Sequence, residues 1–177
     1  MSDAARSPRA SGHVYLSGFM AVGKSTVGPR LAGRLGVPFV DLDARIEASA
    51  GRTVAAIFAT FGEAAFRARE AAAVADLVGE APAVVALGGG AVLDARNRAT
   101  LRASGVLLTL AARLETVRRR VGDDASRPLL TGDLEARLAA RAAAYADANA
   151  TIDTDARSPD EVVAEAEAVL AALGWAP

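Results

Sequence analysis

The sequence predicts an α/β fold with a doubly wound parallel sheet, and two observations support this prediction. Short apolar runs alternate with longer, alanine-rich stretches along most of the chain, an order typical of a parallel sheet covered by helices. The short runs are apolar throughout and do not alternate with polar residues. That pattern is typical of parallel strands that are covered on both faces.

Five segments have the length and composition of strands. They are residues 13–17 (HVYLS), 38–42 (PFVDL), 83–87 (AVVAL), 106–110 (VLLTL) and 151–154 (TIDT). Helices are expected between them, because alanine has the highest helix propensity of all residues. The alanine-rich segments are residues 25–35, 62–78, 133–149 and 159–173. The last begins at Pro159, and the first turn of a helix tolerates a residue without an N–H group.

One segment does not fit this alternation. Residues 121–133 (VGDDASRPLLTGD) are polar, contain glycine and proline, and lie between two expected helices. A loop of this length inside a compact domain is usually functional or mobile. We therefore expect this segment to take part in function.

Length and composition exclude several classes of protein. A chain of 177 residues, 52% of them hydrophobic, is long enough for one domain with a substantial core. It has no cysteine and a single histidine, His13, which excludes disulfides, thiolate catalysis and zinc sites built on these residues. We expect His13 to be an edge residue without a role. The net charge of -1 and the few aromatic residues argue against a nucleic-acid partner.

The hydropathy and the first residues predict where the protein resides. No apolar stretch approaches the roughly 18 residues that a transmembrane helix needs, so we expect no membrane partner and a cytoplasmic location. Residues 1–12 (MSDAARSPRASG) contain arginines but no apolar segment of the kind found in secretory signals. A transit peptide is the alternative, but Asp3 and the short length favour a disordered leader. Residues 13–177 are then expected to form a single domain.

A glycine-rich motif follows the first expected strand. Four residues separate Gly18 from Gly23, Lys24 and Ser25, and an expected helix comes directly afterwards. This is the pattern of a phosphate-binding loop, in which glycines let backbone N–H groups approach a polyphosphate at the positive end of a helix. Lys24 supplies charge for the phosphates, and the Ser25 hydroxyl is a ligand for Mg²⁺. An accidental glycine turn is the alternative, but lysine and serine in register favour the phosphate site.

Two carboxylates and an arginine with acidic neighbours follow. Asp41 and Asp43, two residues apart at the end of an expected strand, are predicted to face the phosphate site together. Alternatively, Asp43 caps the next helix, and the spacing does not decide between these readings. Glu63, Arg67 and Glu70 share one helix face. This suits either a surface ion-pair ladder or an arginine held ready for a carboxylate or phosphate.

Three consecutive glycines, Gly88, Gly89 and Gly90, follow the third expected strand. Glycines at the carboxyl end of a strand leave room for a ligand against the backbone, although a flexible turn is the alternative. Arg127 in the polar loop and Arg141 beyond it add positive charge. Carboxylates for hydroxyl groups and arginines for an anion together favour a hydroxylated carboxylate as substrate.

In order and approximate spacing, the motifs of this chain resemble those of the shikimate kinase family. The motifs are GFMAVGKST, DLD, GEAAFRARE, GGG, RPLL and RAAAY, and the resemblance extends from residue 15 to about residue 158. It implies a three-layer P-loop fold of the nucleoside-monophosphate-kinase type, with a five-stranded parallel sheet, helices on both faces and a mobile lid over about residues 121–131. It also implies a monomer that uses ATP and Mg²⁺ to phosphorylate the 3-hydroxyl of shikimate. The products are shikimate 3-phosphate and ADP, in a step of chorismate and aromatic amino-acid biosynthesis.

The resemblance assigns a nucleotide site to particular residues. Ser25 and Asp41 hold Mg²⁺, the second of them through water. Arg120 stacks on the adenine, opposite Arg157 or Pro159. The nucleotide-binding residues that the resemblance implies are Gly18, Ala21, Val22, Gly23, Lys24, Ser25, Thr26, Arg120, Arg127, Arg157 and Pro159.

The resemblance also assigns a substrate site. Asp43 binds the hydroxyls of shikimate and orients or deprotonates the attacking one, which makes it catalytic together with Lys24 and Arg127. Arg67 and Arg141 hold the carboxylate of the substrate. The substrate-binding residues that the resemblance implies are Asp43, Arg67, Glu70, Gly88, Gly89, Gly90, Arg127 and Arg141, with Glu70 supporting Arg67 and Arg127 reaching both ligands from the lid.

The chain departs from the family pattern in two places, and three other readings compete. The family often has glycine at the position of Ala21, and the stretch between RPLL and RAAAY is shorter than in some members.

Gluconate kinases also phosphorylate a hydroxylated carboxylate but lack this combination of FRxxE and DLD. A regulatory P-loop switch is suggested by DLVG at residues 76–79, but the chain has no guanine-binding N-K-x-D motif. A catalytically silent binding module is disfavoured because the lysine, the serine and both aspartates are retained.

Overall fold

The structure is a computed structural model that describes residues 12–121 and 134–176. The predicted leader 1–12 and the predicted lid 121–131 lie outside the described residues, except for residue 12 of the first and residue 121 of the second. The lid arginine that the resemblance implies, Arg127, lies outside them as well.

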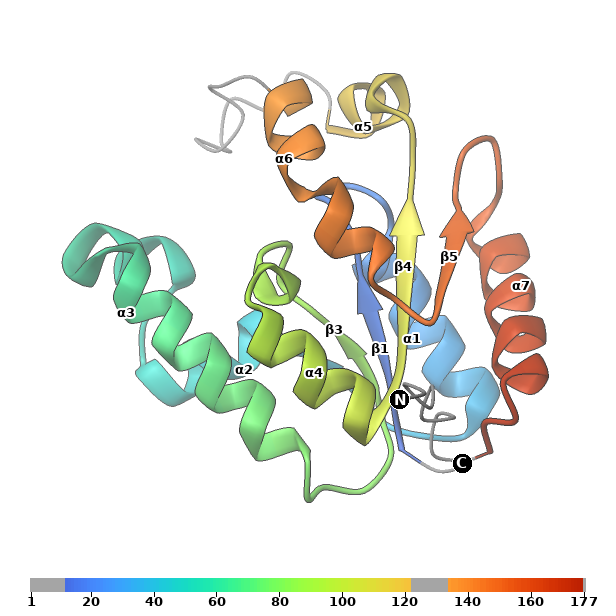
Figure 1. Ribbon diagram of the computed structural model, residues 1–177, viewed down its shortest axis with the longest axis horizontal. Coiled ribbons are helices and arrows are strands. Elements are labelled where there is room, and N and C mark those ends of the chain that lie inside the picture. Colours follow the sequence, from blue (N-terminus) through green and yellow to red (C-terminus); the bar gives the residue numbers. More distant parts are fainter. Residues whose placement is uncertain (1–11, 122–133, 177) are drawn as a thin grey trace, which may run out of the picture.

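Five strands form one parallel sheet, which confirms the predicted fold class (Figure 1). The order of the strands in the sheet is β2-β3-β1-β4-β5. The chain therefore leaves β1 toward one edge of the sheet and later crosses to the other, so that a switch point lies between β1 and β3. Ligands of such sheets bind outside the carboxyl ends of the strands at the switch point. The strands are β1 (His13–Ser17), β2 (Phe39–Asp41), β3 (Val84–Ala86), β4 (Gly105–Ala111) and β5 (Ala150–Asp153).

Helices cover both faces of the sheet (Figure 1). They are α1 (Lys24–Leu35), α2 (Leu42–Ala50), α3 (Val54–Leu77), the 3-10 helix η1 (Ala91–Leu93), α4 (Ala95–Ser104), α5 (Leu114–Val121), α6 (Leu134–Ala146) and α7 (Pro159–Ala172). The helices α1 and α7 pack against each other on one face, and α3 and α4 pack together on the other. Each helix in the described part of the chain is too short or too polar to span a membrane.

The helix expected over residues 62–78 is the second part of a longer one. α3 begins at Val54, and the Thr53 hydroxyl caps it by accepting a hydrogen bond from the N–H of Ala56 at 3.2 Å. Gly62 interrupts the helical backbone with a φ of 79° and kinks the helix. The residue ranges expected for helices did not include α2, α4 or α5, although the helix expected before residue 121 and the alternative of Asp43 as a cap implied two of them. Each of these short helices buries only two residues, which leaves little apolar pattern to recognise.

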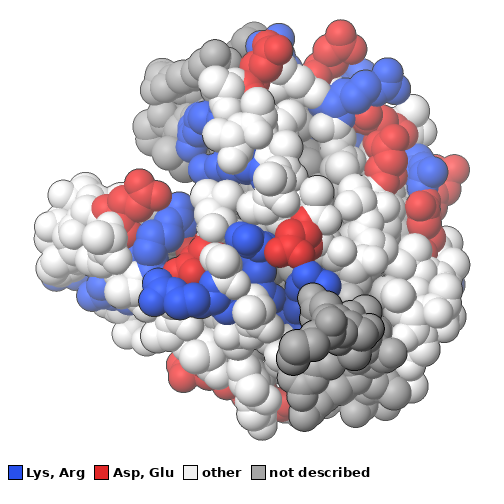
Figure 2. Space-filling model, in the orientation of Figure 1, with Lys and Arg blue, Asp and Glu red and all other residues white. Residues whose placement is uncertain are grey.

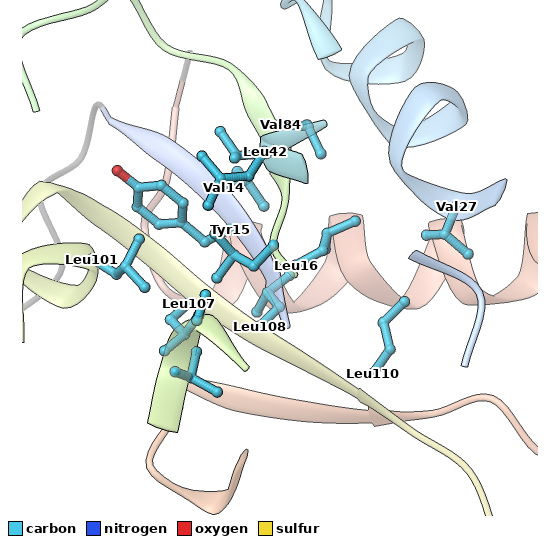
Figure 3. Packing of buried hydrophobic residues seen from close by; sticks show 14 of the residues in the cluster. Val14, Tyr15, Leu16, Val27, Leu42, Val84, Leu101, Leu107, Leu108 and Leu110 are labelled. Carbon is cyan, nitrogen blue, oxygen red and sulfur yellow. The ribbon is translucent and has the colours of Figure 1, made fainter. Parts of the chain in front are cut away.

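The core lies on both faces of the central strands, which explains why these strands are apolar throughout. Val14, Leu16 and Leu108 are fully buried (Figure 3). His13 is the first residue of β1, is 2% exposed, and donates from Nε2 to the carbonyl oxygen of Leu77 at 2.7 Å. The prediction that His13 is an edge residue is therefore wrong, because β1 is a central strand and the strand order cannot be read from local sequence.

Tyr15 is expected to make the fold less stable at alkaline pH. Its side chain is fully buried, and its hydroxyl shares a hydrogen bond with Ser104 Oγ at 2.8 Å. Burial raises the pKa of Tyr15 from 10.0 to about 12. The unfolded chain loses this proton first, so stability falls between pH 10 and pH 12, by up to roughly 2–3 kcal/mol. We expect the free energy of unfolding of Tyr15→Phe, measured with urea at several pH values, to fall less than that of the parent between pH 10 and pH 12. An equal fall in the two proteins would contradict this assignment.

Candidate active site

Two cavities adjoin at the carboxyl ends of the central strands. The α3–α6 cavity, of about 760 Å³, is lined by residues of α3 and α6, and the α5–α7 cavity, of about 500 Å³, by residues of α5 and α7. Figure 2 shows the molecule hollowed between α3 and α6, with basic and acidic side chains nearby. Ala21, Lys24 and Ser25 line both cavities, so the cavities meet at the amino end of α1.

The loop between β1 and α1 has the backbone of a phosphate-binding loop. Gly18 and Gly23 have φ values of 131° and 109°, and a Cβ on Gly18 would lie 2.2 Å from the carbonyl oxygen of Leu110. Lys24 Nζ donates to the carbonyl oxygens of Gly18 and Phe19 at 2.7 and 2.8 Å. Burial lowers the pKa of Lys24 to about 8. An incoming phosphate would therefore supply counter-charge to an ammonium that is poorly solvated here.

Lys24 is also the single lysine of the chain. Lysine and arginine total 20 residues, and all the others are arginine. Arginine suits planar, bidentate ion pairs, whereas a compact ammonium on a flexible stem suits a phosphate loop. A single lysine in an arginine-rich chain, placed in the phosphate-binding loop, is a further signal of function in the sequence.

The α5–α7 cavity brings together the residues predicted on the base side of the nucleotide. Arg120 on α5 donates from Nη1 to Thr154 Oγ1 at 2.9 Å and from Nη2 to the carbonyl oxygen of Thr154 at 2.6 Å. Arg157, which forms an ion pair with Glu165, and Pro159 at the start of α7 line the same cavity. Thr154 was not predicted as a site residue, although its place at the carboxyl end of the last expected strand was a usable signal.

Asp41 and Asp43 both line the α3–α6 cavity, but not for the predicted reason. β2 ends at Asp41, which caps α2 by accepting a hydrogen bond from the N–H of Ala44 at 3.1 Å. Asp43 lies inside α2, so the shared strand face was a wrong prediction, and so was the alternative that Asp43 is the cap. Asp43 Oδ1 is buried without a hydrogen-bond partner among the described residues. Burial, reinforced by the charge of Asp41, raises the pKa of Asp43, and a ligand hydroxyl would satisfy the unpaired oxygen.

Arg67 is held between two acids, as the spacing on α3 predicted. Its Nη1 donates to Glu70 Oε2 at 2.8 Å, and its Nη2 donates to Glu63 Oε1 at 3.1 Å. The Glu70 side chain is only 1% exposed, so the alternative of a surface ladder is wrong for this pair. All three residues line the α3–α6 cavity. A guanidinium that two carboxylates fix in one orientation is preorganised for an anionic ligand.

The glycines after β3 make room for side chains of the site. A Cβ on Gly88 would lie 2.6 Å from Asp43 Oδ1, and a Cβ on Gly90 would lie 2.3 Å from Arg67 Nη1. A Cβ on Gly89 would make only ordinary contacts, the nearest at 3.6 Å. The predicted reason, space for a ligand against the backbone, was therefore incomplete. The three glycines line the cavity, and two of them also let functional side chains pack across the segment.

α6 supplies further basic side chains to the α3–α6 cavity. Arg141 Nη1 and the Tyr145 hydroxyl both donate to the carbonyl oxygen of Gly89, at 3.2 and 2.7 Å. Arg137 lines the cavity one turn before Arg141. Neither Arg137 nor Tyr145 was predicted, although the i, i+4 spacing of these three α6 residues places them on one helix face.

Comparisons with known proteins give the same family as the motifs. The family model described as shikimate kinase matches residues 20–171. A shikimate kinase of Geobacter sulfurreducens is 47% identical over 158 residues, which cover 86% of this chain and 87% of that protein. The solved structure of a shikimate kinase from Acinetobacter baumannii in complex with shikimate is 33% identical, with a TM-score of 0.85 and coverage of 92% of this chain and 94% of that chain. A gluconokinase from Sinorhizobium meliloti, 20% identical with a TM-score of 0.63 over 94% of this chain and 95% of that chain, is similar in fold alone. The chain therefore belongs to the shikimate kinase family.

Proposed function

We propose that this protein transfers the γ-phosphoryl group of ATP to the 3-hydroxyl of shikimate, giving shikimate 3-phosphate and ADP for chorismate and aromatic amino-acid biosynthesis. The observation that carries the proposal is that two cavities meet at Lys24 and Ser25. ATP in the α5–α7 cavity directs its terminal phosphate to this junction, and an acceptor in the α3–α6 cavity reaches the same point. Membership of the shikimate kinase family supports the choice of acceptor.

Phosphoryl transfer requires alignment and charge neutralisation more than covalent chemistry from the protein. Arg67 on α3, fixed by two acids, and Arg141 on α6 hold the carboxylate of shikimate. Asp43 accepts a hydrogen bond from the attacking hydroxyl, and the burial that raises its pKa makes it a better proton acceptor. Lys24 and the amino end of α1 balance the charge of the transferring group. Alignment of this kind can lower the barrier by roughly 7–11 kcal/mol.

The residues at the junction fit a bound Mg²⁺. The Ser25 hydroxyl and the Asp41 carboxylate line the α3–α6 cavity beside Lys24. Mg²⁺ prefers oxygen ligands and usually combines one or two protein groups with waters and phosphate oxygens. Among the described residues, no group of three His, Cys, Asp or Glu side chains forms a separate metal cage. The ion supplies charge neutralisation when bound, and Ser25 and Asp41 would hold it at the junction.

ATP consumption with shikimate and with gluconate as separate acceptors tests this function. We expect ADP release that depends on shikimate, with shikimate 3-phosphate identified by mass spectrometry. Turnover with gluconate alone would favour a gluconate kinase, and tight ATP binding without a phosphorylated product would favour a binding module. The monomeric state and the cytoplasmic location stay predictions, the first of them measurable by light scattering.

Gly90→Ala is expected to raise the KM for shikimate about ten- to a hundredfold and to change the KM for ATP little. The new Cβ would lie 2.3 Å from Arg67 Nη1, so the guanidinium must leave its position between Glu63 and Glu70. The φ of -109° at Gly90 is open to alanine, so the substitution adds no backbone strain. Gly89→Ala is the matched comparison, with an expected change below about threefold because its Cβ makes ordinary contacts. Similar KM values for the two variants would contradict the assigned role of Arg67.

A further inference from the structure

Arg120 connects the base side of the α5–α7 cavity to the phosphate-binding loop. Its Nη1 donates to the carbonyl oxygen of Ala21 at 3.3 Å and to Thr154 Oγ1 at 2.9 Å, and its Nη2 donates to the carbonyl oxygen of Thr154 at 2.6 Å. Thr154 is itself fixed, because its N–H and its hydroxyl donate to the carbonyl oxygen of Ala111 at 2.8 and 3.1 Å. One guanidinium therefore ties Ala21 to the end of β4.

Ala21 is the residue of the loop that needs such support. Its φ is 58°, in the left-handed region that glycine adopts freely and that a residue with a Cβ disfavours. Strained residues of this kind persist only where the surrounding structure holds them, and they occur preferentially at ligand sites. Because Ala21 lines both cavities beside Lys24, the conformation at this residue sets the direction of the backbone where phosphates would lie.

We infer that Arg120 is a positioning residue for the phosphate-binding loop and holds the turn at Ala21 in its left-handed conformation. The inference rests on the proposed ATP site and deepens it, because the side chain on the base side also shapes the loop on the phosphate side. The two parts of the nucleotide are then recognised together: a base that orders Arg120 also orders the loop. A lysine cannot replace Arg120, because a single ammonium lacks the fork that reaches Thr154 and Ala21 at once.

Tripolyphosphate separates this role from stacking on adenine, because it has phosphates and no base. Its dissociation constant is measured by calorimetry for the parent protein, Arg120→Ala and Arg119→Ala. Arg119 is a matched control for charge, since it is the adjacent arginine of α5 and donates to Thr116 Oγ1 of its own helix at 3.5 Å. We expect Arg120→Ala to weaken tripolyphosphate binding about tenfold and Arg119→Ala to change it by less than about twofold.

Each result of this experiment bears on a different claim. Unchanged tripolyphosphate binding by Arg120→Ala would overturn the inference and leave stacking as the sole role of Arg120. A parent protein that binds no tripolyphosphate would overturn the proposed ATP site, and the inference with it. If circular dichroism shows that Arg120→Ala does not fold, Arg120→Lys takes its place with the same expected loss.

Ala21→Gly supplies an independent test of the same inference. Glycine adopts a positive φ without strain, so a loop with this substitution depends less on Arg120. We expect Arg120→Ala to weaken tripolyphosphate binding less than about threefold in the Ala21→Gly background, against about tenfold in the parent. Equal losses in the two backgrounds would overturn the assignment to Ala21.

Discussion

Lys24→Met is expected to lower kcat for ATP-dependent phosphorylation of shikimate by about two to three orders of magnitude. Lys24 Nζ lies at the junction of the two cavities, where it is held by the carbonyl oxygens of Gly18 and Phe19. Methionine has an unbranched side chain that is one atom shorter than lysine and carries no charge. ADP release at saturating concentrations of both substrates measures the effect, and activity within about twofold of the parent would rule out the assigned role.

The pH dependence of the parent protein gives a second readout of Lys24. Burial lowers the pKa of Lys24 from 10.5 to about 8, so the free protein loses its ammonium above pH 8. The value of kcat/KM for ATP is then expected to fall about tenfold per pH unit, because this ratio reports on the free protein. Bound triphosphate favours the ammonium, so kcat is expected to decline only at higher pH. Profiles of kcat and kcat/KM that coincide would contradict this assignment.

The single lysine also allows a direct chemical test. An amine-selective reagent near pH 8 has Lys24 as its one lysine target. ATP is expected to protect this side chain, because the phosphates would cover Nζ at the junction. Peptide mapping by mass spectrometry measures the labelling rate, and equal rates with and without ATP would place the nucleotide elsewhere.

Asp43→Asn is expected to lower kcat by about two to four orders of magnitude with a much smaller change in the KM for ATP. The amide keeps the shape of the side chain but neither accepts a proton nor carries the charge that orients the attacking hydroxyl. The loss is not expected to come from unfolding. Burial raises the pKa of Asp43 above 3.8, so keeping this carboxylate ionised at neutral pH costs stability. The melting temperature of Asp43→Asn is therefore expected to equal or exceed that of the parent.

Asp41→Asn is the matched control for this prediction. Asp41 accepts a hydrogen bond from the N–H of Ala44, and asparagine is an equally good helix cap. We expect this variant to keep most of its kcat while it requires a higher Mg²⁺ concentration. A larger loss of kcat in Asp41→Asn than in Asp43→Asn would reverse the two roles. A lower melting temperature for Asp43→Asn would make its effect structural.

The parts of the site that were predicted from the sequence are those whose residues lie close together in the chain. The phosphate-binding loop is one short segment, and Arg67 meets Glu63 and Glu70 within one helix. Local spacing fixes such contacts because a helix brings residues three and four apart together. For the same reason, the α6 residues Arg137 and Tyr145 could have been predicted from their spacing to Arg141.

Other parts of the site depended on contacts that local spacing does not contain. The place of Asp43 inside α2 depended on where β2 ends, and element boundaries are the least certain feature of a sequence-based prediction. The space that a Cβ on Gly88 or Gly90 would need is taken by the side chains of Asp43 and Arg67, which come from two other segments of the chain. No motif indicated that the carbonyl oxygen of Ala21 accepts a hydrogen bond from Arg120, because 99 residues separate the two.

The sequence by itself determined the α/β class, the five parallel strands, the phosphate-binding loop and the acids that hold Arg67. These features follow from backbone preferences and side-chain spacing within single elements. Only the tertiary structure decided the strand order, the central place of β1 that buries His13, and the meeting of two cavities at Lys24. The physical reason is that the packing of helices across a sheet, and not the spacing along the chain, sets which distant residues share a cavity.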